Sequence, residues 1–373
     1  MTARYRHALV IGKFYPPHRG HHHLVRSAAR IADRVTVVVM ASAAESIPLA
    51  DRVSWMRQTH TGDATVRVTG IACDAPMDLE STAVWAAQVA CMRAAVRQVD
   101  MTPIDAVVSS EKYGDELAQW FGATHVCVDP DRIAHPVSGT ACRSDLAGHW
   151  DLLDEPARAG LATRVVVVGS ESTGTTSVSR ALAQRYRDRG GVWARTGWVP
   201  EYGRQATLDK LDRLRAVRPD AAMEELEWTG DDFADIAREQ TRMEESAARA
   251  GSPVLICDTD AFATTVWERR YLGTDSARAW VEVADRPAIY LLTDHVGVPF
   301  VQDGIRDGEH IRAEMTRWFE DALTATGRSW VLLTGPLSER VDLAVRVVNL
   351  ALAQRSSFGA PLVTAFRAAR HPD

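Results

Sequence analysis

Cysteine is scarce in this sequence and shows no pattern. The 373 residues include five cysteines, an odd number, and no two of them form a CxxC pair. This argues against a zinc site and against a disulfide framework. Long apolar runs are lacking too, since none approaches the ~20 residues that span a bilayer, and the first six residues begin no signal peptide. We therefore expect a cytoplasmic protein that does not bind a membrane.

An excess of positive charge is also lacking. Lys and Arg number 43 against 49 Asp and Glu, which gives a formal net charge of −6. A broad surface for nucleic acid is therefore not expected. The chain is 46% hydrophobic and 25% charged, as in ordinary globular proteins, and it is long enough for two domains. The composition does not determine the oligomeric state and is compatible with a homo-oligomer.

One stretch near the N-terminus, Gly12–His21, reads GKFYPPHRGH. The apolar run His7–Ile11 predicts a strand before it, and apolar residues at helical spacing predict a helix after it. A helix N-terminus carries unpaired N–H groups and about half a positive charge, so it attracts anions. A single histidine in a turn is usually solvated. The complete G-x-F-x-P-x-H-x-G-H pattern, with His18 and His21 at the helix start, favours a triphosphate site.

This motif resembles the nucleotidyltransferase superfamily with the HxGH signature, whose members join a nucleotide to a phosphate or acyl acceptor. The resemblance implies that His18 and His21 hold phosphate oxygens of ATP. It further implies that Lys13 and Arg52 neutralise charge on the phosphates. Gly12 and Phe14 complete the motif and are expected at the substrate.

A second signature follows in the expected order. Pro136–Arg143 reads PVSGTACR, in which Ser138 stands five residues before Arg143. In the superfamily the serine caps a helix and the arginine contacts ATP phosphates, while Gly139 and Thr140 would add donors at the helix start. Taken alone, a Ser-Gly-Thr sequence is common at the N-terminus of a helix. After an HxGH motif it supports the same nucleotide site.

An aromatic residue is expected to stack on the nicotinamide ring, because dinucleotide-forming members of the superfamily do so from the corresponding region. Trp85, near the start of a helix predicted over Ser81–Arg97, is our candidate, with Trp55 as its rival. A tryptophan at such a position is more often part of the core.

The second half of the chain begins with another nucleotide-binding pattern. After a polar linker that contains Pro156 and Gly160, Arg164–Val168 reads as a buried strand, and it is followed by GSESTGTTS from Gly169. This is the frame of a P-loop, with Gly169 and Gly174 in place. The lysine after the second glycine is replaced by Thr175. Thr176 remains available for Mg²⁺.

The order of these patterns resembles the bifunctional NadR family, which pairs nicotinamide mononucleotide adenylyltransferase with ribosylnicotinamide kinase. Supporting segments are VPEYGR, LICDTD and VPFVQDGIRD. They supply the expected residues of the second site, namely Glu201, Asp258, Asp260 and Arg306. Among the three carboxylates the resemblance does not decide which is the base. The branch of the family that represses transcription carries a further N-terminal segment, so direct DNA binding is not expected here.

The fold class that follows is α/β with two doubly wound parallel-sheet domains. Residues 1–159 would form a Rossmann-like adenylyltransferase domain and residues 160–373 a P-loop kinase-like domain. The charged stretch Thr207–Asp220 is expected to be a mobile surface insertion, and Asp232–Ala248 a solvated helix.

Three functions are compatible with this organisation. In the first, ATP and nicotinamide mononucleotide give NAD and pyrophosphate with Mg²⁺, and the second domain phosphorylates ribosylnicotinamide, an activity that Thr175 puts in question. In the second, the C-terminal domain is a non-catalytic sensor of NAD or ATP that regulates the first. In the third, the acceptor is different, such as pantetheine phosphate or glycerol phosphate.

Overall fold

The computed structural model describes residues 4–273, 276–283, 288–304, 306 and 308–362. The chain divides into two compact units, of which the second is Leu161–Arg355. The first unit consists of the residues up to Gly160 together with those from Ser356 onward. We call the described part of this return, residues 356–362, the C-terminal segment. Our expectation had placed it in the second domain. Its hydrogen bonds to Tyr15, Ser46 and Met77 explain the difference.

The first unit contains a five-stranded parallel sheet in the order β3-β2-β1-β4-β5. Helices connect consecutive strands, as in a doubly wound sheet. Its elements are β1 (Ala8–Gly12), α1 (Arg19–Ile31), β2 (Val35–Ala41), α2 (Leu49–Thr59), β3 (Val66–Ala72), α3 (Thr82–Arg97), β4 (Ala106–Ser109), α4 (Gly114–Phe121), β5 (Thr124–Cys127), α5 (Gly139–Ser144), η1 (Trp150–Leu152) and α6 (Glu155–Leu161).

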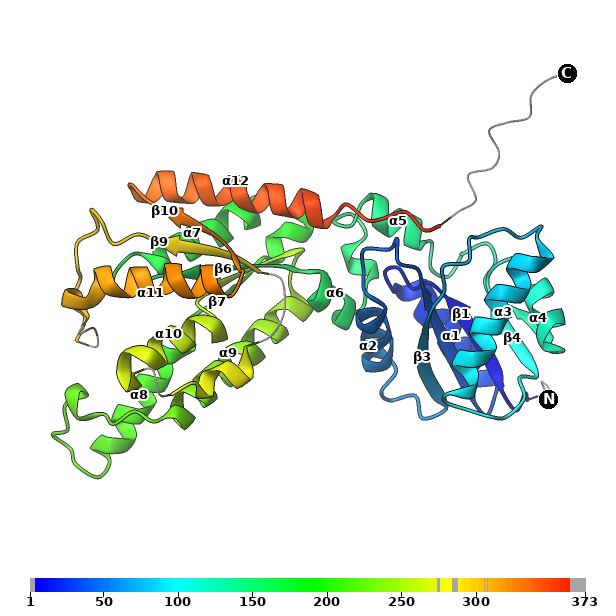
Figure 1. The fold of residues 1–373 in the computed structure, drawn as a ribbon, viewed down its shortest axis with the longest axis horizontal. Coiled ribbons are helices and arrows are strands. Elements are labelled where there is room, and N and C mark those ends of the chain that lie inside the picture. Colours follow the sequence, from blue (N-terminus) through cyan, green and yellow to red (C-terminus); the bar gives the residue numbers. More distant parts are fainter. Residues whose placement is uncertain (1–3, 274–275, 284–287, 305, 307, 363–373) are drawn as a thin grey trace, which may run out of the picture. The chain divides into compact units, whose positions relative to one another are not determined.

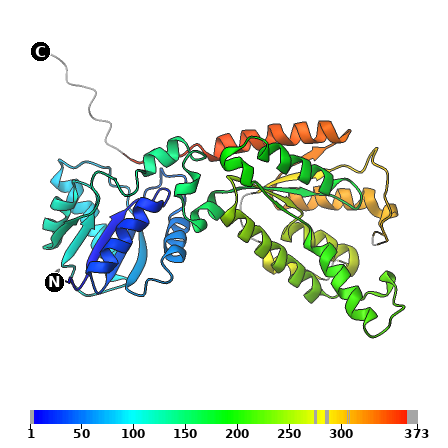
Figure 2. The same cartoon turned by 180° about the vertical axis from the view of Figure 1, so that it is seen from behind.

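Both faces of this sheet are covered, which is why its strands read as continuous apolar runs. On one face Val10 and Val37 pack against α1 and α2. On the other face Leu9 and Val38 pack against α3 and α4. Figure 2 shows α1 lying across the sheet. The two layers fix the turn between β1 and α1 at the carboxyl edge of the sheet, where ligands bind in such folds.

The second unit, which is drawn in Figure 1, contains another five-stranded parallel sheet. Its strand order is β10-β9-β6-β8-β7. The doubly wound fold class is thereby confirmed for both domains. The elements are β6 (Thr163–Val168), α7 (Thr175–Arg187), η2 (Gly191–Arg195), β7 (Gly197–Val199), α8 (Tyr202–Arg215), η3 (Met223–Glu225), α9 (Gly230–Ala250), β8 (Val254–Asp258), α10 (Ala261–Leu272), η4 (Arg278–Glu282), β9 (Ala288–Thr293), η5 (Glu309–Ile311), α11 (Arg312–Ala325), β10 (Ser329–Leu333) and α12 (Leu337–Arg355).

Two local predictions in this unit need correction. The stretch expected to be a mobile insertion, Thr207–Asp220, is helical in its first part, because α8 continues to Arg215. The helix expected to be solvated, α9, buries one stripe that includes Phe233 and Ile236. The many charged residues on its other face made the buried stripe difficult to recognise from the sequence. Among the described residues, no helix is long and apolar enough to cross a membrane.

Candidate functional site

The first domain has a cavity of about 410 Å³ at the carboxyl edge of its sheet. The β1–α1 turn, the loops after β4 and β5, and the start of α5 supply most of its wall. The lining residues are Lys13, Phe14, Tyr15, His18, Gly20, His21, His23, Leu24, Met77, Ser110, Glu111, Val128, Asp129, Arg132, His135, Val137, Ser138, Gly139, Thr140, Arg143 and Pro361. The structure thus brings the two sequence signatures together around one cavity.

His18 is 4% exposed, and neither of its ring nitrogens has a hydrogen-bond partner among the described residues. Burial, with the nearby charge of Arg132 and then that of His135, lowers the pKa of His18 to about 3. The His21 ring stacks on it with centroids 3.6 Å apart. A Cβ at Gly20 would lie 3.2 Å from the His18 ring, which accounts for the glycine between the histidines. Two buried nitrogens without a partner, in a cavity wall, are suited to an oxygen-rich ligand.

The second signature forms the part of the wall next to the β1–α1 turn. Ser138 caps α5, and its hydroxyl accepts a hydrogen bond from the Ala141 N–H at 3.1 Å. Arg143 donates from Nη1 to the carbonyl oxygen of Tyr15 at 2.7 Å, and its guanidinium lies 5.0 Å from the centre of the Tyr15 ring. The two signatures are therefore joined by a direct hydrogen bond, with Gly139 and Thr140 between them in the wall.

Arg52 does not lie where the resemblance implies. It is fully buried and outside the lining of the cavity, and it donates to Glu45 at 2.6 Å and to the carbonyl oxygens of Ile47 and Lys13. Glu45 also binds the Lys13 ammonium at 2.6 Å. Burial of Glu45 would raise its pKa, but hydrogen bonds from Lys13 and Arg52 leave the pKa below its usual value. Arg52 therefore supports the turn rather than reaching into the cavity.

Trp85 also departs from the prediction. It is 5% exposed, packs in the core with Val89 and Met92, and donates its indole N–H to the Leu79 carbonyl oxygen. Its rival Trp55 is 7% exposed, and neither tryptophan lines the cavity. Trp85 begins an apolar stripe at helical spacing that continues along α3. Such a stripe indicates a core position, and here it was a better guide than the resemblance. Gly12, at the end of β1, does not line the cavity either.

The structure adds residues that sequence reasoning missed. Arg132 and His135 also line the cavity, and Arg132 pairs with Glu111 at 2.6 Å. Both follow the strand that ends at Cys127, so a charged loop at the carboxyl end of a strand was the available signal. Pro361, from the C-terminal segment, had no such signal.

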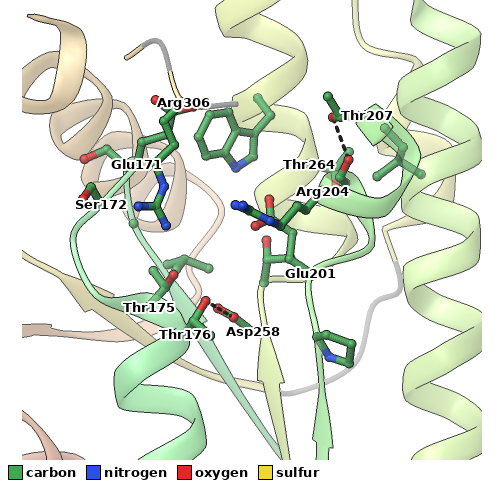
Figure 3. A pocket seen from close by; sticks show the side chains of 18 of the residues that line it. Glu171, Ser172, Thr175, Thr176, Glu201, Arg204, Thr207, Asp258, Thr264 and Arg306 are labelled. Atoms are coloured by element: carbon green, nitrogen blue, oxygen red, sulfur yellow. Dashed lines mark hydrogen bonds between the residues drawn. The ribbon is translucent and has the colours of Figure 1, made fainter. Parts of the chain in front are cut away.

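The second domain has a cavity of about 520 Å³ over the P-loop. Thr175 and Thr176 lie at the first turn of α7, and the Thr176 hydroxyl donates to Asp258 at 2.6 Å (Figure 3). Burial raises the pKa of Asp258, although hydrogen bonds from Thr176 and Thr175 act against it. A hydroxyl and a carboxylate at the first turn after a P-loop are hard oxygen donors of the kind Mg²⁺ prefers. Gly174, at φ +89°, forms the turn itself and does not line the cavity.

Glu201, the residue just before α8, lines this cavity. Burial raises its pKa to about 7, and the negative charge of Asp258 adds to the effect. Arg204 and Arg306 point into the cavity in Figure 3. Both are paired with Asp303, at 2.7 Å and 3.5 Å. Cationic groups therefore remain beside the P-loop although its lysine is replaced.

Asp260 does not share this cavity. Its carboxylate caps α10 through the Ala263 N–H at 2.8 Å and accepts a hydrogen bond from the Tyr290 hydroxyl at 2.6 Å. It is 9% exposed, and it is not among the lining residues of the cavity over the P-loop. Of the three candidate carboxylates, the structure therefore leaves Glu201 and Asp258 at the site.

Comparisons with known proteins agree with this architecture. Residues 9–144 match the cytidylyltransferase-like family and residues 164–340 an AAA domain. Over 313 residues the chain is 21% identical to the trifunctional NAD biosynthesis/regulator protein NadR of Salmonella typhimurium, covering 80% of this chain and 71% of the relative. The same figures hold for NadR of Escherichia coli.

Two solved structures share the whole fold. They are crystal structures of NadR protein, one in complex with NR and one in complex with NAD and AMP-PNP. Their TM-scores are 0.63 and 0.64 at 20% identity, and each match covers 94% of this chain and 97% of the other.

The fold and the two cavities define a two-domain protein in which a nucleotidyltransferase domain precedes a P-loop domain. The resemblance to the NadR family, indicated by the motifs, is confirmed by the order of the matched families and by the relatives. The chain accordingly shares the two-domain organisation of the NadR proteins.

Proposed function

We propose that the first domain transfers the adenylyl group of ATP to nicotinamide mononucleotide, giving NAD and pyrophosphate. The observation that carries the proposal is the pair of buried, unpartnered nitrogens of His18 in the cavity wall. A neutral imidazole placed there can donate to a phosphate oxygen. His21, Lys13 and Arg143 lie around the same cavity. The NadR relatives, one solved with NAD and AMP-PNP, support the choice of substrates.

The proposed reaction needs no covalent intermediate with the protein. An oxygen of the acceptor's phosphate attacks the α-phosphorus of ATP, and the bond from that phosphorus to the pyrophosphate oxygen breaks. Positioning and neutralisation of charge supply such catalysis. His18 and His21 would hold phosphate oxygens at the start of α1, while Lys13 and Arg143 offset the charge that develops on the leaving pyrophosphate.

Mg²⁺ is the proposed cofactor of both domains, brought with ATP. Among the described residues no group of three or more His, Cys, Asp or Glu side chains is arranged to hold a metal alone. A metal held jointly with phosphate oxygens fits this better than a resident ion. In the second domain Thr176 and Asp258 would be its protein ligands. The ion would supply charge neutralisation on the phosphates.

For the second domain we propose a nucleotide site with ribosylnicotinamide kinase architecture. Glu201 fits the role of base for the substrate hydroxyl, because of the two predicted carboxylates that line this cavity it is the one without a hydrogen bond from the P-loop threonines. Thr175, in the position of the P-loop lysine, favours a second candidate function, in which this domain binds NAD or ATP and regulates the first.

A coupled assay of the purified protein tests both proposals. ATP and Mg²⁺ are supplied with either nicotinamide mononucleotide or ribosylnicotinamide, and NAD, pyrophosphate and ADP are measured. We expect NAD with the mononucleotide. Product from ribosylnicotinamide as well would show an active kinase, whereas nucleotide binding without turnover would favour the sensor. Failure of adenylyl transfer, with pantetheine phosphate or glycerol phosphate accepted instead, would contradict the proposed substrate.

A prediction independent of activity concerns Glu201. Its pKa of about 7 in the folded chain lies above the ordinary value of 4.5, so the folded state binds a proton that the unfolded chain releases earlier. Stability from this group is present below pH 4.5 and is lost as the pH rises through 7. We therefore expect Glu201→Gln to raise the melting temperature at pH 8 relative to the native protein, and the gain to shrink toward pH 5.

Thermal unfolding at several pH values measures this difference. The matched control is Glu224→Gln, because Glu224 lines the same cavity but is exposed. A gain at Glu201 that does not vary with pH would contradict the raised pKa.

A further inference from the structure

The C-terminal segment is hydrogen-bonded to three separate loops of the first domain, those after β1, β2 and β3. The hydroxyl of Tyr15 donates to the Gly359 carbonyl oxygen at 3.0 Å, and the Gly359 N–H donates to the Ser46 hydroxyl at 3.2 Å. Further along, the Met77 N–H donates to the Leu362 carbonyl oxygen at 3.1 Å. Because backbone groups of both Gly359 and Leu362 are hydrogen-bonded, the path of this short segment along the first domain is fixed at two points.

The packing of this segment leaves little space. A Cβ at Gly359 would lie 2.2 Å from the carbonyl oxygen of Ala44, closer than any real contact, so glycine is required there while the segment is seated. The ring of Phe358 meets the Tyr15 ring edge-on, with centroids 5.8 Å apart. Pro361 then forms part of the wall of the nucleotide cavity. The segment is therefore closely packed against the first domain and contributes to the wall of its cavity.

Tyr15 links this segment to the phosphate-binding side of the cavity. It is 1% exposed, its hydroxyl is held by Ser46 and Gly359, and its carbonyl oxygen accepts the hydrogen bond from Arg143. The guanidinium groups of Arg52 and Arg143 lie 4.4 Å and 5.0 Å from the centre of its ring. Movement of the tyrosine therefore moves the group that orients Arg143.

We propose that the C-terminal segment is a functional part of the first nucleotide site. It holds Tyr15, a positioning residue, in the place from which Tyr15 orients Arg143 toward the phosphates of a nucleoside triphosphate. Pro361 closes the wall beside Met77. The inference deepens the proposed function and rests on it for the identity of the triphosphate. His18 and His21, at the start of α1, make no hydrogen bond to the segment among the described residues. Loss of the segment therefore acts through Arg143 on the triphosphate rather than on the binding of nicotinamide mononucleotide.

One substitution and one short C-terminal truncation test the role of the segment. Gly359→Val cannot seat the segment, because its side chain would overlap Ala44. Ala360→Val is the matched control, since Ala360 is exposed. A chain that ends at Ser356 lacks Phe358, Gly359 and Pro361 together, and so tests the segment independently of how Gly359→Val alters its path. We expect both disrupted proteins to show a kcat/KM for ATP lowered by about tenfold or more, with the KM for nicotinamide mononucleotide changed less than threefold.

A second readout does not depend on catalysis. Amide exchange at Met77 should become faster in Gly359→Val, and protection of residues 138–143 by ATP should need about tenfold more ATP than in the native protein. If the native protein shows this ATP protection but transfers no adenylyl group, the proposed function fails and the role of the segment stands. If the folded chain ending at Ser356 binds and uses ATP as the native protein does, the role of the segment is refuted.

Discussion

Replacing His18 with alanine is expected to lower kcat for adenylyl transfer by on the order of 10²- to 10³-fold. Among the described residues, the buried side chain of His18 in the first cavity has no hydrogen-bond partner, so its hydrogen-bonding capacity is free for the ligand. Its lowered pKa of about 3 means that the imidazole enters the site neutral and acts by hydrogen bonding. Loss of one such donor from a water-poor site removes interactions made to the charge of the transition state. Steady-state kinetics with ATP and nicotinamide mononucleotide measures the effect.

The stability of this variant distinguishes a lost catalytic group from a damaged fold. Burial of an unpartnered polar side chain costs free energy, so His18→Ala should keep the melting temperature or raise it. His60 is the matched control, because it is equally buried but bonded to His22 and Asp63 and lies outside the cavity. We expect His60→Ala to lower the melting temperature and to leave kcat within about threefold. A His18→Ala protein that turns over normally would remove the basis of the proposed function.

The sequence was sufficient wherever a site is built from one strand, one turn and one helix. The HxGH turn and the P-loop are of this kind, and their residues lie together in the structure because β1 and β6 end beside the helices that follow them. Ser138 and Arg143 could be joined to His18 only through the family order. The structure supplies the physical link, which is the hydrogen bond from Arg143 to the Tyr15 carbonyl oxygen.

Prediction failed where a role depends on a partner far away in the chain. Arg52 carries the residue type that phosphates attract, but Glu45 and two carbonyl oxygens hold it inside the domain. Asp260 stands in the DTD segment like Asp258, yet Tyr290 and the α10 terminus engage its carboxylate. The seat of Gly359 depends on loops more than 280 residues earlier, and no local pattern announces such a contact.

Restoring the P-loop lysine, as Thr175→Lys, is expected to raise the turnover of ribosylnicotinamide phosphorylation by on the order of 100-fold. Thr175 lines the cavity at the first turn of α7, the position from which a lysine reaches the β- and γ-phosphates as a point charge. The nearby cations do not replace it fully, because Arg204 and Arg306 are both paired with Asp303. The gain should fall on kcat rather than KM, since the added charge acts mainly in the transition state. Product formation with ATP, Mg²⁺ and ribosylnicotinamide measures it.

Thr175→Met is the control that isolates the charge, because methionine has nearly the length of lysine and no ammonium group. Only the lysine variant should gain activity, and Glu201→Gln in the lysine background should abolish that gain by removing the proposed base. If lysine and methionine variants turn over alike while nucleotide still binds, the missing charge is not what limits this domain. The sensor function would then explain better why the cavity keeps Thr176, Asp258 and three arginines around an altered P-loop. Binding needs the cradle of backbone N–H groups, whereas catalysis needs the added charge.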